Sequence, residues 1–242
     1  MRYNHLLRFI ISALLLLTCA VVVTAKTYVV CVGINKYPKS ALRLCVADAD
    51  SVKYIYDHQK GTQAIILRDH QGTRDNILST LRRQFSQATA DDHILFYFAG
   101  HGYPGGFCAI DGNIPYSDIR KALASSSAKH KMIFADACFA GKMRKTKQST
   151  QQQNQIKNAD VLLFLASRSN ETSGESTAIK NGYFTSALKR GLRGAADVNR
   201  DRDITAKELF NYVSEKVKSS TNDKQHPVMW GKFSDNMSVI RW

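Results

Sequence analysis

Apolar and polar residues alternate along the chain in a way that predicts short buried strands separated by helices. Runs rich in β-branched, aromatic and other apolar residues predict six strands, at 27–34, 64–67, 93–99, 131–135, 161–166 and 237–240. Apolar residues recur at helical spacing in the segments 41–56, 73–85, 116–124, 184–192 and 205–217. Strands that are apolar throughout, such as 93–99, are typical of parallel sheets covered on both faces. The pattern therefore predicts a single three-layer α/β domain with a mostly parallel six-stranded sheet and helices on both faces.

Two segments interrupt this pattern. Residues 102–115 are rich in glycine and aromatic residues, which indicates a loop or a small hairpin. Residues 141–158 consist mainly of Lys, Gln, Ser and Thr with almost no apolar side chains, so we expect an exposed linker loop at 139–159. Loops of this length in compact domains are often functional or open to cleavage.

The first 25 residues have the composition of a targeting segment. Arg2 and Arg8 precede an almost wholly apolar run, Phe9–Val23, and small residues follow it up to Ala25. The run is shorter than the roughly 20 residues that a comfortable membrane span needs. We therefore interpret residues 1–25 as a secretory signal peptide and residues 26–242 as the mature domain, which would be exported to a periplasm or secreted. The alternatives are an uncleaved membrane anchor and lipid attachment at Cys19.

The mature chain is basic and contains four cysteines. Without residues 1–25 it has 32 basic and 20 acidic side chains, a formal net charge of +12. No basic motif interleaved with aromatic residues is present, so we expect a solvated surface and no nucleic-acid partner. The spacing of the cysteines fits no zinc pattern, and export would permit but does not require disulfides: Cys31, Cys45, Cys108 and Cys138.

A histidine and a cysteine follow two of the predicted parallel strands. His101 comes after the strand 93–99, and Cys138 comes after the strand 131–135. Because ligands bind beyond the carboxyl ends of such strands, we expect these two side chains to meet at one edge of the sheet. A thiolate is a strong nucleophile, and a nearby imidazole can act as its general base and acid. The backbone N–H groups of Gly102 and Cys138 are candidate donors to a developing oxyanion.

Several sequence pieces resemble a known family when they are taken together and in order. They are VGINKY at 32–37, CVADAD at 45–50, FYFAGHG at 96–102, DACFAG at 136–141, ASRSNETSGES at 166–176 and GYFTSALKRGL at 182–192. This ordered set resembles the caspase and metacaspase family of cysteine peptidases and spans nearly the whole mature chain. The resemblance implies a caspase-haemoglobinase-like fold with His101 and Cys138 as the catalytic pair.

The resemblance also implies a specificity pocket. Metacaspase-like enzymes line this pocket with acidic residues, and the matching positions are Asp48, three residues after Cys45, and Asp136, two residues before Cys138. We include Cys45 among the expected substrate contacts. Two carboxylates select a basic side chain, so we expect a peptide or protein substrate cleaved after Arg or Lys. Many metacaspases have Ser where this chain has Ala99, which puts the Arg-versus-Lys preference in doubt.

The linker loop adds a further hypothesis, because it contains four basic residues: Lys142, Arg144, Lys145 and Lys147. The family's large and small portions are joined at this place. A peptidase that accepts basic residues would be able to cut itself there, and the alternative is a plain solvated basic loop.

An acidic segment near the C-terminus follows the pattern of a calcium loop. The candidate ligands are Asp197, Asn199, Asp201, Asp203 and Glu208, with Glu208 at the twelfth position. However, Arg202 occupies the position at which such loops normally have glycine. The alternative is an acidic turn that caps a helix at Thr205. We expect thiol catalysis to need no cofactor, and we retain Ca²⁺ as a possible ligand of this segment.

Two other functions stay open at this point. A caspase-like chain without catalytic activity would bind a peptide or protein partner, but it would not need both His101 and Cys138. A different thiol hydrolase, such as an amidase, would not need the two acidic residues.

Overall fold

The computed structural model describes residues 25–137, 160–167, 175–176 and 181–242. Its centre is a six-stranded sheet in which five strands are parallel and the edge strand β12 runs antiparallel to β8. The strands follow one another across the sheet as β12 (Val228–Lys232), β8 (Asp160–Leu165), β7 (His130–Asp136), β3 (His93–Ala99), β1 (Thr27–Gly33) and β2 (Thr62–Arg68).

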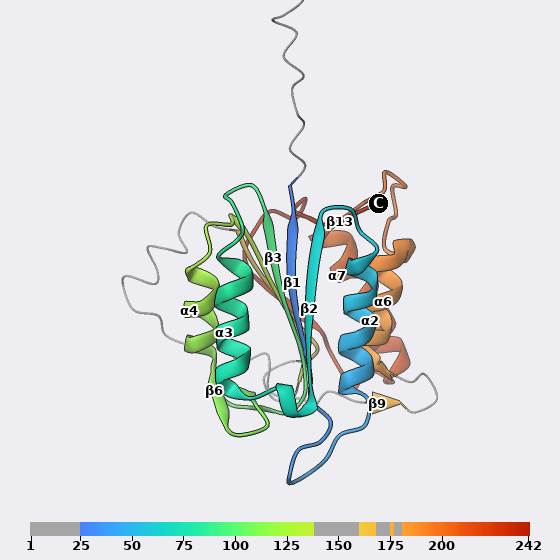
Figure 1. Ribbon diagram of the computed structural model, residues 1–242. Coiled ribbons are helices and arrows are strands. Elements are labelled where there is room, and N and C mark those ends of the chain that lie inside the picture. The colour runs from blue at the N-terminus through green and yellow to red at the C-terminus, as the bar shows by residue number, and fades with distance from the viewer. Residues whose placement is uncertain (1–24, 138–159, 168–174, 177–180) are drawn as a thin grey trace, which may run out of the picture.

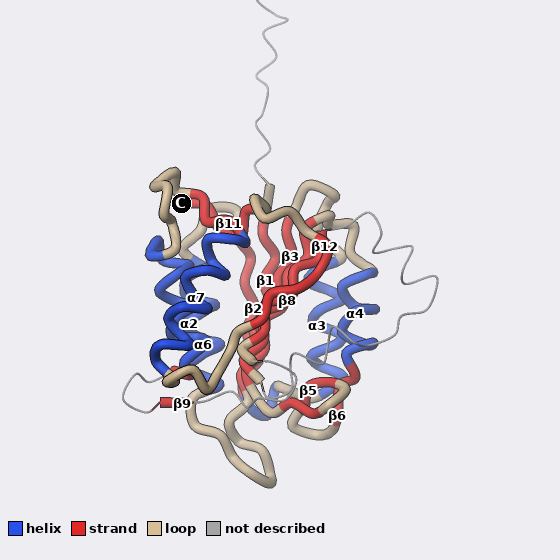
Figure 2. Tube along the Cα trace, turned by 180° about the vertical axis from the view of Figure 1, so that it is seen from behind, coloured by secondary structure: helices blue, strands red, loops and turns tan. Residues whose placement is uncertain are grey.

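Helices cover both faces of this sheet, which gives three layers (Figures 1 and 2). One face is covered by α3 (Arg74–Phe85) and α4 (Tyr116–Ala124). The other is covered by α2 (Cys45–Asp57), α6 (Tyr183–Arg190) and α7 (Ala206–Ser220). A 3-10 turn at Asp69–Gln71 follows β2, and a π-turn at Gly191–Ala195 follows α6. The predicted fold class is confirmed.

The central strands are mostly apolar because both of their faces are buried, as β3 illustrates. In β3, Phe96 and Phe98 belong to the core under α3 and α4, together with Leu81 and Ile119. The intervening Leu95 and Tyr97 belong to the second core under α2, α6 and α7. Alternate side chains of a strand point to opposite faces, so a strand between two helical layers is apolar at most positions.

The loops that leave the carboxyl ends of the parallel strands lie at the lower edge of the sheet in Figure 1. A three-stranded sheet follows β3 and consists of β4 (Gly102–Tyr103), β5 (Gly106–Cys108) and β6 (Asn113–Pro115). A short antiparallel pair, β9 (Glu175–Ser176) and β10 (Asn181–Gly182), precedes α6. Residues 102–115 thus form a small sheet, in agreement with the predicted hairpin.

Two predictions about the elements were wrong in detail. The segment 237–240 forms a strand, β13 (Ser238–Arg241), but it pairs with β11 (Asp203–Thr205) outside the main sheet. The sixth strand of the main sheet is instead β12, which the sequence pattern missed because this half-exposed edge strand contains Gly231 and Lys232. The helix expected from Ala41 begins at Cys45, because the Asn35 carbonyl accepts a hydrogen bond from the Leu42 N–H and holds the preceding residues in a loop.

Two segments of the sequence analysis lie outside the described residues. These are residues 1–24 of the signal peptide and the whole linker loop, 139–159. Export and linker exposure therefore stay predictions. Within the described ranges, no helix combines the length and the apolar character that crossing a membrane would need.

Two histidines stack at the amino ends of β3 and β7, and they predict acid sensitivity. The rings of His93 and His130 lie 4.6 Å apart, and burial, with a smaller contribution from His130, lowers the pKa of His93 to about 4. Asp92 and Asp203 act in the opposite direction, and Arg241 acts with His130. In the unfolded chain His93 takes up its proton near its ordinary pKa of about 6.5. Stability should therefore fall as the pH drops from about 6.5 to 4, by on the order of 2 kcal/mol.

Urea unfolding at pH 7 and pH 4.5 measures this loss. In a His93→Gln variant, the free energy of unfolding should differ less between pH 7 and pH 4.5 than it does in the wild-type protein. If the variant retains the full pH dependence, His93 is not its source.

Candidate active site

His101 follows the carboxyl end of β3, beside the end of β7. In the parallel pairing of these strands, Ala99 is the partner of Asp136, and the Gly100 N–H donates to the Asp136 carbonyl at 3.3 Å. His101 comes two residues after Ala99, and Cys138 comes two residues after Asp136. The two strands are therefore neighbours that end together, as predicted. Cys138 itself lies outside the described residues, so its role as nucleophile and oxyanion donor stays a prediction.

The imidazole of His101 is held by the loop that joins β1 to α2. Its Nε2 atom lies 2.6 Å from the Ser40 carbonyl oxygen. Because a carbonyl oxygen only accepts hydrogen bonds, Nε2 must carry the hydrogen. In the neutral ring, Nδ1 is then the nitrogen with a free lone pair, which is the atom that can accept a proton from a thiol. Ser40 has a left-handed backbone with φ of 61°, which is uncommon for a residue other than glycine.

The two predicted pocket carboxylates both lie close to Gly182. Asp48, in the first turn of α2, is 2% exposed, and Asp136, at the end of β7, is 7% exposed. A Cβ atom at Gly182 would lie 2.6 Å from Asp136 Oδ2 and 3.4 Å from Asp48 Oδ2. The fold thus brings together two acidic residues that are 88 positions apart in the sequence. Asp48 is not a solvated helix-face carboxylate.

Asp48 is oriented by the residues of β10. Its Oδ1 accepts hydrogen bonds from Asn181 Nδ2 at 2.7 Å and from the Gly182 N–H at 3.1 Å. Lys189 Nζ donates to Asn181 Oδ1 at 2.7 Å. Lysine can only donate and a carboxylate can only accept, so these two neighbours determine which end of the Asn181 amide faces Asp48.

Asp136 is oriented by α6 and by β3. Its Oδ2 accepts hydrogen bonds from the Thr185 N–H at 3.2 Å and from Thr185 Oγ1 at 2.7 Å. The Tyr97 hydroxyl lies 2.6 Å from the same Oγ1 and must be the donor there, because the Thr185 hydrogen is directed to Asp136. Burial, together with the charges of Asp48 and Asp136, raises the pKa of Tyr97 well above its usual value and keeps this donor protonated.

The other predicted site residues lie at the same edge. Gly102 begins β4 directly after His101, and Cys45 is buried one turn before Asp48. Their roles as oxyanion donor and substrate contact stay predictions. Sequence reasoning assigned no role to Ser40, Asn181 or Thr185. Thr185 lies within the family-like piece 182–192, but nothing in its spacing indicates a bond to Asp136.

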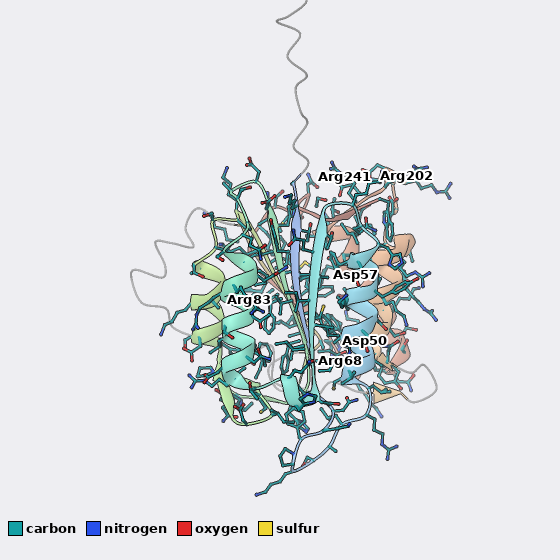
Figure 3. All side chains as sticks on the ribbon, viewed as in Figure 1. Asp50, Asp57, Arg68, Arg83, Arg202 and Arg241 are labelled. Atoms are coloured by element: carbon teal, nitrogen blue, oxygen red, sulfur yellow. The ribbon has the colours of Figure 1, made fainter. Side chains whose placement is uncertain are left out.

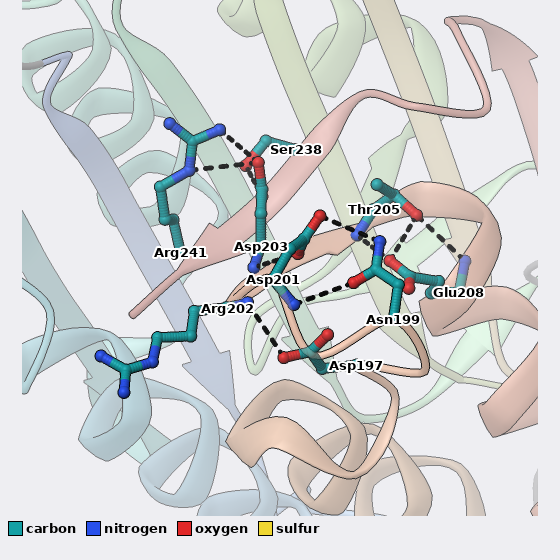
Figure 4. A network of polar contacts seen from close by, with 9 residues as sticks. All are labelled: Asp197, Asn199, Asp201, Arg202, Asp203, Thr205, Glu208, Ser238 and Arg241. Atoms are coloured by element: carbon teal, nitrogen blue, oxygen red, sulfur yellow. Dashed lines mark hydrogen bonds and ion pairs between the residues drawn. The ribbon is translucent and has the colours of Figure 1, made fainter.

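The calcium-like segment forms a network of internal hydrogen bonds, which Figure 4 shows. Asp203 accepts hydrogen bonds from Ser238 and from the Arg241 guanidinium. Glu208 forms a capping box with Thr205 at the start of α7. Arg202 has φ of 66°, so it adopts the left-handed conformation for which the pattern normally uses glycine. Within the described residues, no three His, Cys, Asp or Glu side chains are grouped so that they would hold a metal ion.

Calcium binding by this segment therefore stays a prediction. A bound ion would have to compete with Arg241 for Asp203 and draw Glu208 out of its capping box. If Asp197, Asn199 and Asp201 contribute to such a site, millimolar calcium should raise the melting temperature of the protein. An unchanged melting temperature at that concentration would remove the prediction.

Comparisons with known proteins agree with this architecture. The model of the family described as "Caspase domain" matches residues 26–237. The search of curated proteins found no match. Similar solved structures include a structure titled pro-sf-caspase-1, with 15% identity, a TM-score of 0.65, and 89% of this chain and 94% of that chain covered. Caspase-1 from Spodoptera frugiperda has 16% identity and a TM-score of 0.62, with 88% of each chain covered.

Protein GSU0716 from Geobacter sulfurreducens has 15% identity and a TM-score of 0.64, with 86% of this chain and 94% of that chain covered. At these identities the structural matches show the fold alone. The family match, in contrast, spans most of the sequence, including the strand ends at which His101 and Asp136 lie. The chain therefore belongs to the caspase-domain family, whose fold is of the cysteine-peptidase type.

Proposed function

We propose that this protein is a cysteine endopeptidase that cleaves peptides or proteins after Arg or Lys. Cys138 is the nucleophile, and His101 is the general base and acid. The observation that supports the specificity is that two buried carboxylates, Asp48 and Asp136, both lie close to Gly182. Membership of the caspase-domain family supports the reaction type.

The reaction follows from the orientation of His101. Nδ1 takes the thiol proton, and the Cys138 sulfur attacks the scissile carbonyl carbon. The oxyanion that forms accepts hydrogen bonds from the backbone N–H groups of Gly102 and Cys138. The protonated imidazole then gives its proton to the leaving amine, and a thioester remains. Water, deprotonated by His101, hydrolyses this thioester and restores the thiol.

The pocket selects a cation because two carboxylates are already oriented by the protein. Asn181 and the Gly182 N–H orient Asp48, while Thr185 orients Asp136. A guanidinium or ammonium group offers hydrogen-bond donors and a positive charge to both carboxylates. An acidic substrate residue would instead add a third negative charge to a buried site, which is strongly unfavourable.

A panel of fluorogenic peptides ending in Arg, Lys or Asp tests this function. The wild-type protein should release the fluorophore from the Arg and Lys peptides only, and a Cys138→Ala variant should release none. Activity that survives in Cys138→Ala would overturn the assignment of the nucleophile. Cleavage of the Asp peptide would overturn the role of the two carboxylates.

Self-cleavage rests on the same specificity. Lys142, Arg144, Lys145 and Lys147 lie outside the described residues, so the hypothesis rests on their charge and on their position after Cys138. Intact mass spectrometry of the wild-type protein should show two fragments, and Cys138→Ala should stay intact. An intact wild-type chain under conditions of full peptidase activity would contradict self-cleavage.

The competing function is a caspase-like module that binds without cutting. The bond from His101 Nε2 to the Ser40 carbonyl argues against it, because a binding module does not need a histidine fixed in one tautomer. Binding of an Arg peptide without any turnover in the panel would favour this alternative.

A further inference from the structure

The side chain of Tyr37 contacts both the backbone and the imidazole ring of His101. The Tyr37 hydroxyl accepts a hydrogen bond from the His101 N–H at 3.1 Å and donates one to the Cys108 carbonyl at 2.8 Å. The ring of Tyr37 lies against the imidazole, with centroids 4.6 Å apart. Burial raises the pKa of Tyr37 above its usual value, so the hydroxyl keeps the hydrogen that it donates. One buried side chain therefore joins the histidine to the small sheet that follows it.

The loop that carries Tyr37 is itself fixed at both ends. Asp69 Oδ1 accepts hydrogen bonds from the N–H groups of Asn35 and Lys36, at 2.8 and 3.0 Å. The Asn35 side chain accepts from the Val46 N–H and donates to the Arg43 carbonyl, both at 3.2 Å. These contacts connect the loop to the end of β2 and to the start of α2. Tyr37 is thus a support whose own position is determined by the fold.

Gly100, the residue before His101, leaves just enough space for the contact between the Tyr37 hydroxyl and the His101 N–H. A Cβ atom at Gly100 would lie 2.5 Å from the Tyr37 hydroxyl oxygen. Contacts under 3.0 Å require something to move, so the Tyr37 hydroxyl can reach the His101 N–H only beside a glycine. The Cys108 N–H donates to the His101 carbonyl at 2.9 Å, so both the N–H and the carbonyl of His101 are hydrogen-bonded.

We propose that Tyr37 is a positioning residue that holds His101 in the orientation in which Nε2 meets the Ser40 carbonyl and Nδ1 faces the reaction. The inference rests on the proposed function, since it assigns to Tyr37 a part in the base chemistry of His101. The hydroxyl fixes the backbone of the histidine, and the ring limits rotation of the imidazole. Without the Tyr37 hydroxyl, the imidazole of His101 can move away from the Ser40 carbonyl. The imidazole then loses its preference for one tautomer.

A Tyr37→Phe variant tests the proposal in the absence of any substrate. Long-range proton–nitrogen NMR spectra of protein labelled with ¹⁵N-histidine report the tautomer of each imidazole, and the His101→Ala variant identifies the His101 signals. At pH 8, the wild-type protein should show the Nε2–H tautomer alone for His101, because Nε2 meets the Ser40 carbonyl. Tyr37→Phe should show a mixture of both tautomers. An unchanged His101 signal in Tyr37→Phe overturns the proposal, whatever its activity.

Kinetics supply the second readout. For an Arg peptide, Tyr37→Phe should lower kcat by about 10- to 30-fold and leave KM within about twofold, because a misplaced base slows the chemical step and does not alter the carboxylate pocket. A tautomer mixture with an unchanged kcat would also overturn the proposal. If the wild-type protein cleaves no peptide, the proposed function fails, and the spectra alone decide whether Tyr37 positions His101.

Tyr56→Phe is the matched control. Tyr56 is also a buried tyrosine whose hydroxyl donates to a backbone carbonyl, that of Val239 at 3.5 Å, and it lies near the far end of α2. This variant should keep the wild-type kcat and the wild-type His101 signals. A similar loss in Tyr56→Phe would mean that any buried hydroxyl has this effect, which would overturn the specific role of Tyr37.

Discussion

Replacing His101 with alanine is expected to lower kcat for an Arg peptide by about 1,000-fold, within the range of 10² to 10⁴ that general acid–base catalysis supplies. In the proposed reaction the imidazole has two tasks, since it takes the proton from the thiol and returns it to the leaving amine. Its Nε2 atom is bonded to the Ser40 carbonyl, so Nδ1 is the nitrogen available for both steps. KM should change little, because the carboxylates that we propose to bind the basic side chain stay in place. Steady-state kinetics with the fluorogenic Arg peptide measure both parameters.

The control for this variant is His58→Ala. His58 is an exposed histidine whose Nδ1 atom also lies within hydrogen-bonding distance of a backbone carbonyl, that of Tyr54 at 2.7 Å. It lies just beyond the carboxyl end of α2, away from the edge of the sheet that carries His101. We expect wild-type kinetics from His58→Ala. Equal activity of His101→Ala and the wild-type protein would contradict the assignment of the base.

Neutralising the two pocket carboxylates is expected to have the second large effect. Asp48→Asn or Asp136→Asn should each reduce kcat/KM for Arg and Lys peptides by about 30-fold or more, because removing one charge from a buried ion pair costs about 2–5 kcal/mol. The double variant should lose detectable cleavage after basic residues. Asparagine retains an oxygen that can accept from Thr185 or from the Gly182 N–H, so the fold of the pocket is preserved. Comparing kcat/KM across the peptide panel measures the change.

Asp50→Asn is the matched control for these variants. Asp50 is on the same helix as Asp48, but it pairs with Arg68 at the surface, as Figure 3 shows. Exposed ion pairs contribute little to stability, so this variant should keep both the stability and the specificity of the wild-type protein. If Asp50→Asn weakened cleavage after Arg as strongly as Asp48→Asn, the effect would be one of overall charge. Unchanged Arg cleavage in the double pocket variant would contradict the proposed specificity.

The sequence was sufficient to predict five strands of the main sheet because the interiors of these strands are largely apolar. The run 93–99 has no polar interior residue, and such a run is stable only between two helical layers. The edge strand β12 carries a different pattern, since its Trp230, Gly231 and Lys232 are exposed. An edge strand buries less surface and has no second neighbour, so hydrophobic periodicity contains little information about it.

The candidate site, like the sheet, was predicted only in part. The positions of His101 and Asp136 follow from strand order, because both come at the ends of neighbouring parallel strands. Asp48 was assigned by resemblance, and the structure adds that it shares one buried place with Asp136. Ser40 and Tyr37, which contact His101, and Thr185, which contacts Asp136, were not predicted for a physical reason. Their roles depend on contacts between residues 49 to 64 positions apart, which no local pattern encodes.

Covalent labelling tests the central claim most directly. A peptidyl chloromethyl ketone ending in Arg alkylates a thiolate that it reaches through the specificity pocket, with loss of chloride. After incubation with the wild-type protein, intact mass and peptide mapping should find one adduct, on Cys138, and the matching Asp reagent should label far more slowly. An adduct on Cys45 or Cys108 in place of Cys138, or equal labelling by the two reagents, would contradict the account.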